Sequence, residues 1–186
     1  WLLEYWLALI LVYLSQVILW YIWIKNLKTI QYSTLKTSLG IFGFITDNSK
    51  LIRVILPNKL DQVTIKHKNI KYCNSFMLNT IQQFEQYFNG SRKTFNLKIK
   101  LEISAFYQNV LFEVKNILYG ETCSYKDIAK NIHNPKSYRA VGNANTMNPL
   151  PIIIPCHRVI CANGKIGNYG GGIRLKKKLI MLESLY

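Results

Sequence analysis

The sequence predicts an α+β fold in which a mixed α/β part, residues 32–103, precedes a mainly helical part, residues 104–186. In the first part, two runs rich in β-branched and aromatic residues, 39–46 and 50–57, flank an Asp-Asn-Ser turn, which is typical of a β-hairpin. In the second part, apolar residues recur at helical spacing. These observations favour a sheet-bearing scaffold that is followed by helices.

One helix and one further strand complete the prediction for the first part. Apolar residues at helical spacing predict a helix over residues 75–88, with Ser75 as its N-cap and Asn89 and Gly90 as its stop. Alternating residues predict a strand over 97–103. Because no catalytic or ligand-binding motif occurs in this part, we expect it to be a scaffold.

The helical part opens with a predicted helix over 106–118. Two short helices follow, over 124–129 with Ser124 as N-cap and over 137–146, and an Asn-Pro turn separates them. This is the helix-turn-helix pattern of DNA-binding proteins, although an ordinary helical hairpin gives the same pattern. The second helix is built from small residues, so it either lies against DNA phosphates or packs closely on another helix.

The composition excludes several classes of protein. Of the 186 residues 49% are hydrophobic, and only 10 are Gly and 5 Pro, so neither a disordered nor a collagen-like chain is predicted. There are 24 Lys and Arg against 9 Asp and Glu, which gives a net charge of +15. That excess is interpreted as the mark of an anionic partner, either a nucleic acid or an acidic membrane surface, or as compositional drift in a chain rich in Ile, Lys, Asn and Tyr, with no specific partner.

Residues 1–31 form a hydrophobic N-terminal extension with three open interpretations. Residues 2–24 are almost continuously apolar, and about 20 apolar residues are enough to cross a bilayer. The extension is interpreted as translation upstream of the true start, as a membrane anchor or as an additional packed helix. It lacks the features of a secretory signal. We therefore expect a cytoplasmic protein, with membrane association only if residues 2–24 are genuine.

The cysteines and histidines form no metal-binding or disulfide pattern. The four cysteines contain no C-x-x-C pair, and His67, His133 and His157 are scattered along the chain. The glycine run 170–172 suits a flap or a phosphate-contacting loop, but it is not the loop of a nucleotide hydrolase. We therefore predict reduced thiols, no metal and no cofactor. The lysine run 176–178, on a predicted helix over 173–185, is interpreted as a solvated face.

The chemistry is concentrated at Cys156, which stands between a proline and His157. A cysteine becomes nucleophilic when its surroundings stabilise the thiolate and lower its pKa, and an adjacent histidine oriented by a carboxylate supplies such surroundings. Glu183 is the best candidate for that carboxylate, with Glu121 and Asp127 as alternatives. The residues alone also allow a buried structural thiol.

The sequence Asn-Pro-Leu-Pro-Ile-Ile-Ile-Pro-Cys-His-Arg-Val at 148–159 resembles the active-site signature of the methylated-DNA–protein-cysteine methyltransferases, also called O6-alkylguanine-DNA alkyltransferases. The resemblance extends from about Tyr32 to the end of the chain. It implies a ribonuclease-H-like domain over 32–103 and a winged helix-turn-helix-like domain with the active site over 104–186. It also implies a cofactor-free monomer that moves the alkyl group of O6-alkylguanine, and of O4-alkylthymine, in double-stranded DNA to its own cysteine.

The resemblance implies a catalytic role for five residues. Cys156 matches the alkyl acceptor, and His157 matches the histidine that withdraws the thiol proton through a water. Glu183 matches the carboxylate that orients this histidine, and Asn148 matches the asparagine that braces the active-site turn. Tyr125 matches the tyrosine that helps to flip the nucleotide and donates a proton toward the leaving guanine.

Further residues are implied to handle the DNA. Arg139 matches the arginine that fills the gap in the base stack, and the carbonyl of Val159, with that of Cys156, matches the grip on the guanine amino group. The loop that closes over the flipped base is matched by Tyr169, Gly167 and Gly171.

The sequence departs from the family at a few positions. Some members carry Ser where Gly170 stands, and Tyr138 is bulkier than the residue often found beside the arginine. The Cys/His set with which some members bind zinc is missing. A non-catalytic protein that only binds alkylated bases is the alternative function, but its relatives lack the acceptor cysteine that this chain carries.

Overall fold

The computed structural model describes residues 13–20, 30–60, 71–72 and 77–186. Residues 13–20 are helical and exposed, while the rest of the apolar stretch 2–24 lies outside the described residues, as do the predicted N-cap Ser75 and His67. Among the residues that are described, no helix combines the length and the apolar character that a membrane span requires.

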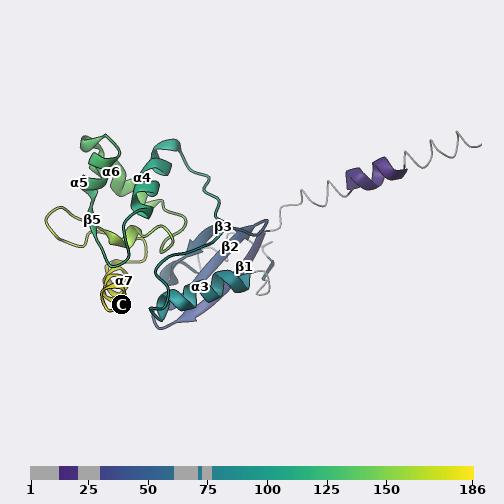
Figure 1. Ribbon diagram of the computed structural model, residues 1–186, viewed down its shortest axis with the longest axis horizontal. Coiled ribbons are helices and arrows are strands. Elements are labelled where there is room, and N and C mark those ends of the chain that lie inside the picture. The colour runs from purple at the N-terminus through teal and green to yellow at the C-terminus, as the bar shows by residue number, and fades with distance from the viewer. Residues whose placement is uncertain (1–12, 21–29, 61–70, 73–76) are drawn as a thin grey trace, which may run out of the picture.

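A mixed sheet forms the N-terminal part (Figure 1). Among the described residues it has the order β3-β2-β1-β4 and consists of β1 (Ile30–Thr37), β2 (Gly40–Asp47), β3 (Lys50–Ile55) and β4 (Lys71–Tyr72). The first three strands are antiparallel, and β4 is parallel to β1. The predicted hairpin is confirmed as β2–β3. Strand β1 begins two residues before the expected boundary at residue 32.

Helix α3 (Leu78–Phe88) lies along one face of this sheet (Figure 1). Its aromatic residues provide the packing, because the ring of Phe84 lies 4.7 Å from that of Phe44 and the ring of Phe88 lies 4.8 Å from that of Phe42. All four rings belong to the apolar core or pack against it. The predicted helix over 75–88 is confirmed from residue 78 onward.

The predicted strand over 97–103 is wrong. In this segment only Ile99 forms a bridge, with Leu51, through hydrogen bonds from Leu51 N to Lys98 O (2.8 Å) and from Lys100 N to Leu51 O (3.0 Å). Alternate residues of the segment are partly buried against the core. The period of two therefore comes from an extended chain that packs over the core, and not from a ladder.

The remaining described elements are one short 3-10 helix that follows β3 and the elements of the helical part, which include two more 3-10 helices. They are η1 (Pro57–Lys59, after β3), α4 (Ala105–Lys115), β5 (Cys123–Ser124), α5 (Tyr125–Asn131), η3 (Pro135–Ser137), α6 (Tyr138–Thr146), η4 (Cys156–Arg158), β6 (Val159–Ile160) and α7 (Ile173–Ser184). The predicted N-cap is confirmed, because Ser124 Oγ accepts a hydrogen bond from Asp127 N. Helices α5 and α6 pack together as the predicted helical pair.

Two backbone contacts position the segment around Cys156. Strand β6, directly after η4, pairs in parallel with β5, directly before α5. On the other side, Val54 N of β3 donates a hydrogen bond to Pro149 O at 2.8 Å. The segment is therefore held between the sheet and the start of α5.

Candidate active site: a buried cysteine beside a charged cluster

The turn before Cys156 is strained and braced by Asn148. Ile152 has φ +78, a region that β-branched residues rarely adopt. The Asn148 side chain holds the turn, since its Nδ2 donates to Ile154 O at 2.8 Å and its Oδ1 accepts from Leu150 N at 3.0 Å. The same Nδ2 lies 3.1 Å from Cys156 Sγ, so it also presents a hydrogen-bond donor to the sulfur.

Cys156 is a neutral thiol at rest. Its side chain belongs to the apolar core, the residue is 6% exposed, and burial raises its pKa to about 11 against the opposing effects of Asn148 and Lys176. The expectation of a lowered pKa is therefore wrong for the free protein. Burial is a tertiary property that a sequence motif does not reveal.

We expect the raised pKa to control the reactivity of this thiol toward iodoacetamide. With a pKa of about 11, labelling of Cys156 should rise about tenfold per pH unit from neutral pH upward, because the thiolate is the reacting form. Peptide mass spectrometry after timed labelling measures this rate at each pH. A Cys156 rate that is already at its plateau at neutral pH would contradict the burial argument.

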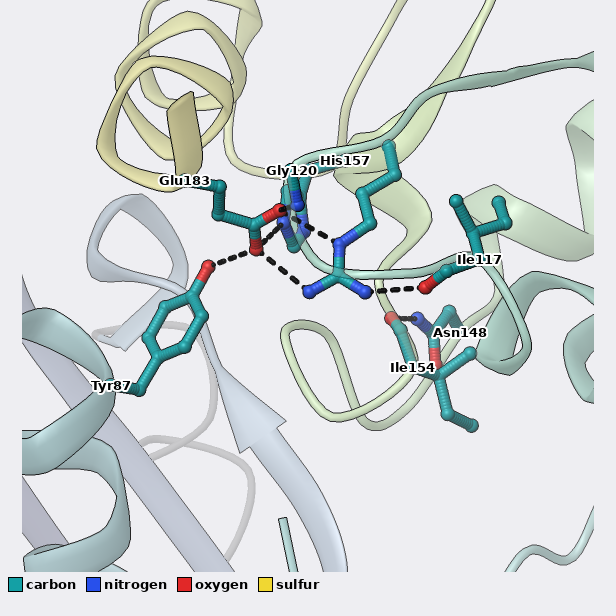
Figure 2. Close-up of polar contacts among 8 residues, drawn as sticks. Tyr87, Ile117, Gly120, Asn148, Ile154, His157 and Glu183 are labelled. Carbon is teal, nitrogen blue, oxygen red and sulfur yellow. Dashed lines mark hydrogen bonds and ion pairs between the residues drawn. The ribbon is translucent and has the colours of Figure 1, made fainter. Parts of the chain in front are cut away.

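Glu183 is the centre of a buried polar cluster (Figure 2). Its Oε1 accepts from His157 Nε2 at 2.8 Å, and its Oε2 accepts from Arg158 Nε at 2.8 Å. Arg158 Nη2 donates to Oε1 at 2.9 Å, and Gly120 N lies 3.3 Å from Oε2. A further donor, the hydroxyl of Tyr87, lies 2.7 Å from Oε1. Of the three candidate carboxylates, the structure thus places Glu183 beside His157, while Glu121 is exposed and Asp127 lies in the first turn of α5.

The cluster fixes the protonation of its members. Burial disfavours the Glu183 carboxylate, but hydrogen bonds from His157 and Arg158 outweigh this and hold its pKa far below the ordinary range. Burial lowers the pKa of His157, so the imidazole is neutral at pH 7. An ionised Glu183 only accepts, so His157 Nε2 carries the proton. His157 Nδ1 is then an acceptor, and it is buried without a hydrogen-bond partner among the described residues.

Lys176 is a buried lysine that the sequence prediction placed on a solvated face. It is 0% exposed, and its Nζ donates to the carbonyls of Val159 and Asn168. The ammonium also lies 5.9 Å from the centre of the Tyr125 ring, and burial lowers its pKa. The solvated-face interpretation is wrong for this residue. Helical spacing offered the signal, since Lys176 shares the buried face of α7 with Leu179 and Glu183.

A cavity of about 390 Å³ opens onto the sulfur. Its lining includes four predicted site residues, Tyr125, Cys156, Gly167 and Tyr169. Two further lining residues, Asn145 and Cys161, were not predicted to belong to a site. The motif carried no signal for Asn145 because its neighbourhood depends on how α6 packs.

The predicted glycines pack closely around this cavity. Gly167 has φ +69, and a Cβ there would lie 3.2 Å from Cys161 Sγ and 3.4 Å from the Tyr125 hydroxyl. Gly171 is not among the lining residues; a Cβ on it would lie 2.5 Å from Leu175 Cδ2. A Cβ at Gly170 would meet only ordinary contacts at 3.7 Å or more. The space at Gly170 therefore admits a serine.

Arg139 lies on the outer surface of the helical pair. It is the second residue of α6 and is exposed, and its guanidinium lies 5.8 Å from the ring of its neighbour Tyr138. It does not line the cavity. The predicted residues thus separate into a group around the sulfur and one exposed arginine on α6.

Known proteins resemble both parts of the chain. The family model described as "6-O-methylguanine DNA methyltransferase, DNA binding domain" matches residues 105–185. The constitutive methylated-DNA–protein-cysteine methyltransferase of Bacillus subtilis is 37% identical over 158 residues, which are 83% of this chain and 95% of the relative. The methyltransferase of the same name from Methanosarcina acetivorans is 49% identical over 108 residues, 58% of this chain and 69% of that protein.

Solved structures give the same result. The crystal structure of Mycobacterium tuberculosis O6-methylguanine methyltransferase superposes with a TM-score of 0.77 at 34% identity and covers 84% of this chain and 93% of its own. A structure of the protein from the same organism in complex with DNA also has a TM-score of 0.77, at 35% identity. It covers 83% of this chain and 93% of its own. These relatives span both the sheet and the helices. The chain therefore belongs to the methylated-DNA–protein-cysteine methyltransferase family.

Proposed function

We propose that this protein repairs DNA by transferring the alkyl group of O6-alkylguanine, and that of O4-alkylthymine, to its own Cys156 in one irreversible step. The observation that carries this proposal is the position of Cys156, whose sulfur faces a cavity of purine-binding size, while the side chain of the next residue, His157, is bonded to Glu183. The resulting thioether is not hydrolysed by water, so each molecule acts once.

The helical part is the proposed DNA-binding surface. The net charge of +15 favours contacts with phosphates, and α5 and α6 form the helix-turn-helix unit of a winged domain over 104–186. The sheet and α3 form a ribonuclease-H-like domain over 32–103. A base inside a duplex is out of reach of the sulfur, so the alkylated nucleotide flips into the cavity. We propose a cytoplasmic monomer that needs no cofactor.

The transfer itself uses the groups around the sulfur. His157 Nδ1 takes the thiol proton through a bridging water, and the Glu183 carboxylate stabilises the imidazolium. The sulfur then attacks the alkyl carbon, the bond between that carbon and O6 breaks, and its electron pair goes to the guanine. Tyr125 donates a proton to this leaving base. Asn148 donates to the sulfur while it carries the negative charge.

The base is held by the wall of the cavity. The carbonyls of Cys156 and Val159 accept from the guanine amino group, and Lys176 orients the Val159 carbonyl. Tyr169 and Gly167 close over the base, and Gly171 lets this loop approach α7 closely.

Intact mass and peptide mass spectrometry test the proposal. After incubation with duplex DNA that contains O6-methylguanine, the protein should gain one methyl group, located on Cys156. Tight binding of that DNA with no gain in mass would support the non-catalytic alternative. Methylation at another cysteine would overturn the assignment of the acceptor.

We expect Arg139→Ala to slow repair of duplex DNA by about tenfold or more and to leave reaction with free O6-benzylguanine nearly unchanged. The guanidinium is proposed to occupy the space of the flipped nucleotide, which exists only in a duplex. Single-turnover rates on both substrates measure the difference. Lys130→Ala on α5 is the control for loss of one exposed positive charge. Equal losses on both substrates would argue against a stacking role for Arg139.

A further inference from the structure

We infer that Tyr87, a residue of the N-terminal part, is a positioning residue for the transfer reaction and acts through Glu183. The inference rests on the proposed function, and it goes beyond it because the N-terminal part was expected to be only a scaffold. Tyr87 is not among the residues that line the cavity at the sulfur. Its effect on the reaction would pass through the carboxylate and then through His157.

The contact joins two distant parts of the chain. Tyr87 is on α3 and Glu183 is on α7, 96 residues away in sequence, and the tyrosine hydroxyl donates to Glu183 Oε1 at 2.7 Å. Figure 2 shows the two side chains pointing toward each other across the space between their helices. Tyr87 is 0% exposed and Glu183 3%, so water does not compete for this bond.

The donor is held rigidly. The Tyr87 ring packs against the rings of Phe88, Phe95 and Tyr119, with centroid distances of 5.3, 5.6 and 6.2 Å. A tyrosine confined in this way presents its hydroxyl from one direction only. Oε1 of Glu183 is therefore fixed by the core of the N-terminal part as well as by Arg158.

The position of Oε1 determines the position of the imidazole. His157 Nε2 binds the same oxygen at 2.8 Å, so a displacement of that oxygen rotates the ring and redirects Nδ1, the atom proposed to take the thiol proton. Indirect partners of this kind fix the tautomer and orientation of a working histidine. Tyr87 thus aligns the base of the reaction without contacting any reacting atom.

The hydroxyl also affects the charge on the carboxylate. Tyr87 shares Oε1 with His157 Nε2 and Arg158 Nη2, and each donor reduces the negative charge available to the others. Removing the hydroxyl leaves more charge to stabilise a protonated His157, so His157 would keep its proton to higher pH. Among the described residues, the other titratable groups whose charges act on this cluster include Tyr119, Tyr169 and Lys176.

Tyr87→Phe tests the inference, with Tyr119→Phe as the matched control. The Tyr119 hydroxyl is buried without a hydrogen-bond partner among the described residues, and its ring lies next to that of Tyr87. At saturating methylated duplex, Tyr87→Phe should slow transfer about tenfold, because the imidazole is no longer held in the alignment that proton transfer requires. Its DNA affinity should not change, and the acidic limb of its pH–rate profile should move to higher pH. Tyr119→Phe should match the wild type.

The outcomes separate the inference from the proposed function. A wild type that fails to become methylated refutes the proposed function. If the wild type transfers the methyl group and Tyr87→Phe has the same rate and the same pH profile, only the role of Tyr87 is refuted. If the variant does not fold, proton NMR of the wild type decides. A slowly exchanging Tyr87 hydroxyl proton with a cross-peak to the His157 Nε2 proton supports the inference, and a rapidly exchanging one overturns it.

Discussion

Cys156→Ala should abolish methyl transfer completely and leave the affinity for methylated duplex within about twofold of the wild type. The sulfur is the proposed acceptor, so no remaining group supplies the new bond to carbon. We propose that the contacts with DNA come from the helical part, and the small thiol is only 6% exposed. Transfer of radiolabelled methyl groups and fluorescence anisotropy with a labelled duplex measure the two properties on one preparation.

Cys161→Ala is the control for this variant, because Cys161 lines the same cavity and carries the same functional group. We expect it to transfer at close to the wild-type rate. A methyl group found on Cys161 in the Cys156→Ala protein would show that position in the cavity, and not the surroundings of Cys156, selects the acceptor. That result would contradict the proposed roles of His157 and Asn148.

Glu183→Gln should lower both activity and stability. The variant should lose about 100- to 10,000-fold in transfer rate, as other enzymes do when the carboxylate behind a catalytic histidine becomes an amide. It should also lose about 3–5 kcal/mol of folding free energy, because the buried guanidinium of Arg158 is left without its counter-charge. Single-turnover kinetics and urea unfolding measure the two losses. Glu121→Gln is the control, since Glu121 is exposed.

The pH dependence of unfolding gives this prediction a second readout. The folded-state pKa of Glu183 is lowered, so its stabilising contribution is complete above the unfolded pKa, about 4.3, and is lost as the pH falls toward the folded value. The pKa of His157 is also lowered, so acidification below about 6.5 protonates the unfolded state first. Both effects reduce stability in acid. The Glu183→Gln protein should lack the loss of folding stability that Glu183 causes below about pH 4.3. If the stability of the variant fell with pH in that range as steeply as that of the wild type, the assigned role of Glu183 would be contradicted.

Local sequence patterns predicted most helices and strands correctly. They failed where tertiary packing determines the conformation or the burial of a residue. The hairpin β2–β3 and the capped helix α5 depend on turn residues and on Ser124, which are visible in sequence. Residues 97–103 alternate because they pack over the core, so periodicity alone suggested a strand. The lysine run 176–178 was predicted to be solvated because charged side chains are usually exposed. Lys176, however, is buried and its ammonium donates a hydrogen bond to a backbone carbonyl.

The site was predictable where its residues are neighbours in a motif. Cys156 and His157 are adjacent in sequence, and Glu183 was selected for its chemistry as well as for the family resemblance. Tyr87 could not be found in this way, because its partner is 96 residues distant and no motif surrounds it. The protonation state of Cys156 could not be predicted from the sequence either, because its pKa depends on burial that only the folded chain creates.

The two-residue pairing of β5 with β6 has a consequence for how damage is found. It joins the residues just before Tyr125 to those just after Arg158, so α5, which belongs to the proposed DNA-binding surface, is tied to the segment that carries Cys156. Because the cavity is already formed in the free protein, we expect the rearrangement on binding to occur mainly in the DNA. We therefore expect weakly paired lesions, which open more readily and for longer, to be captured before intact pairs are.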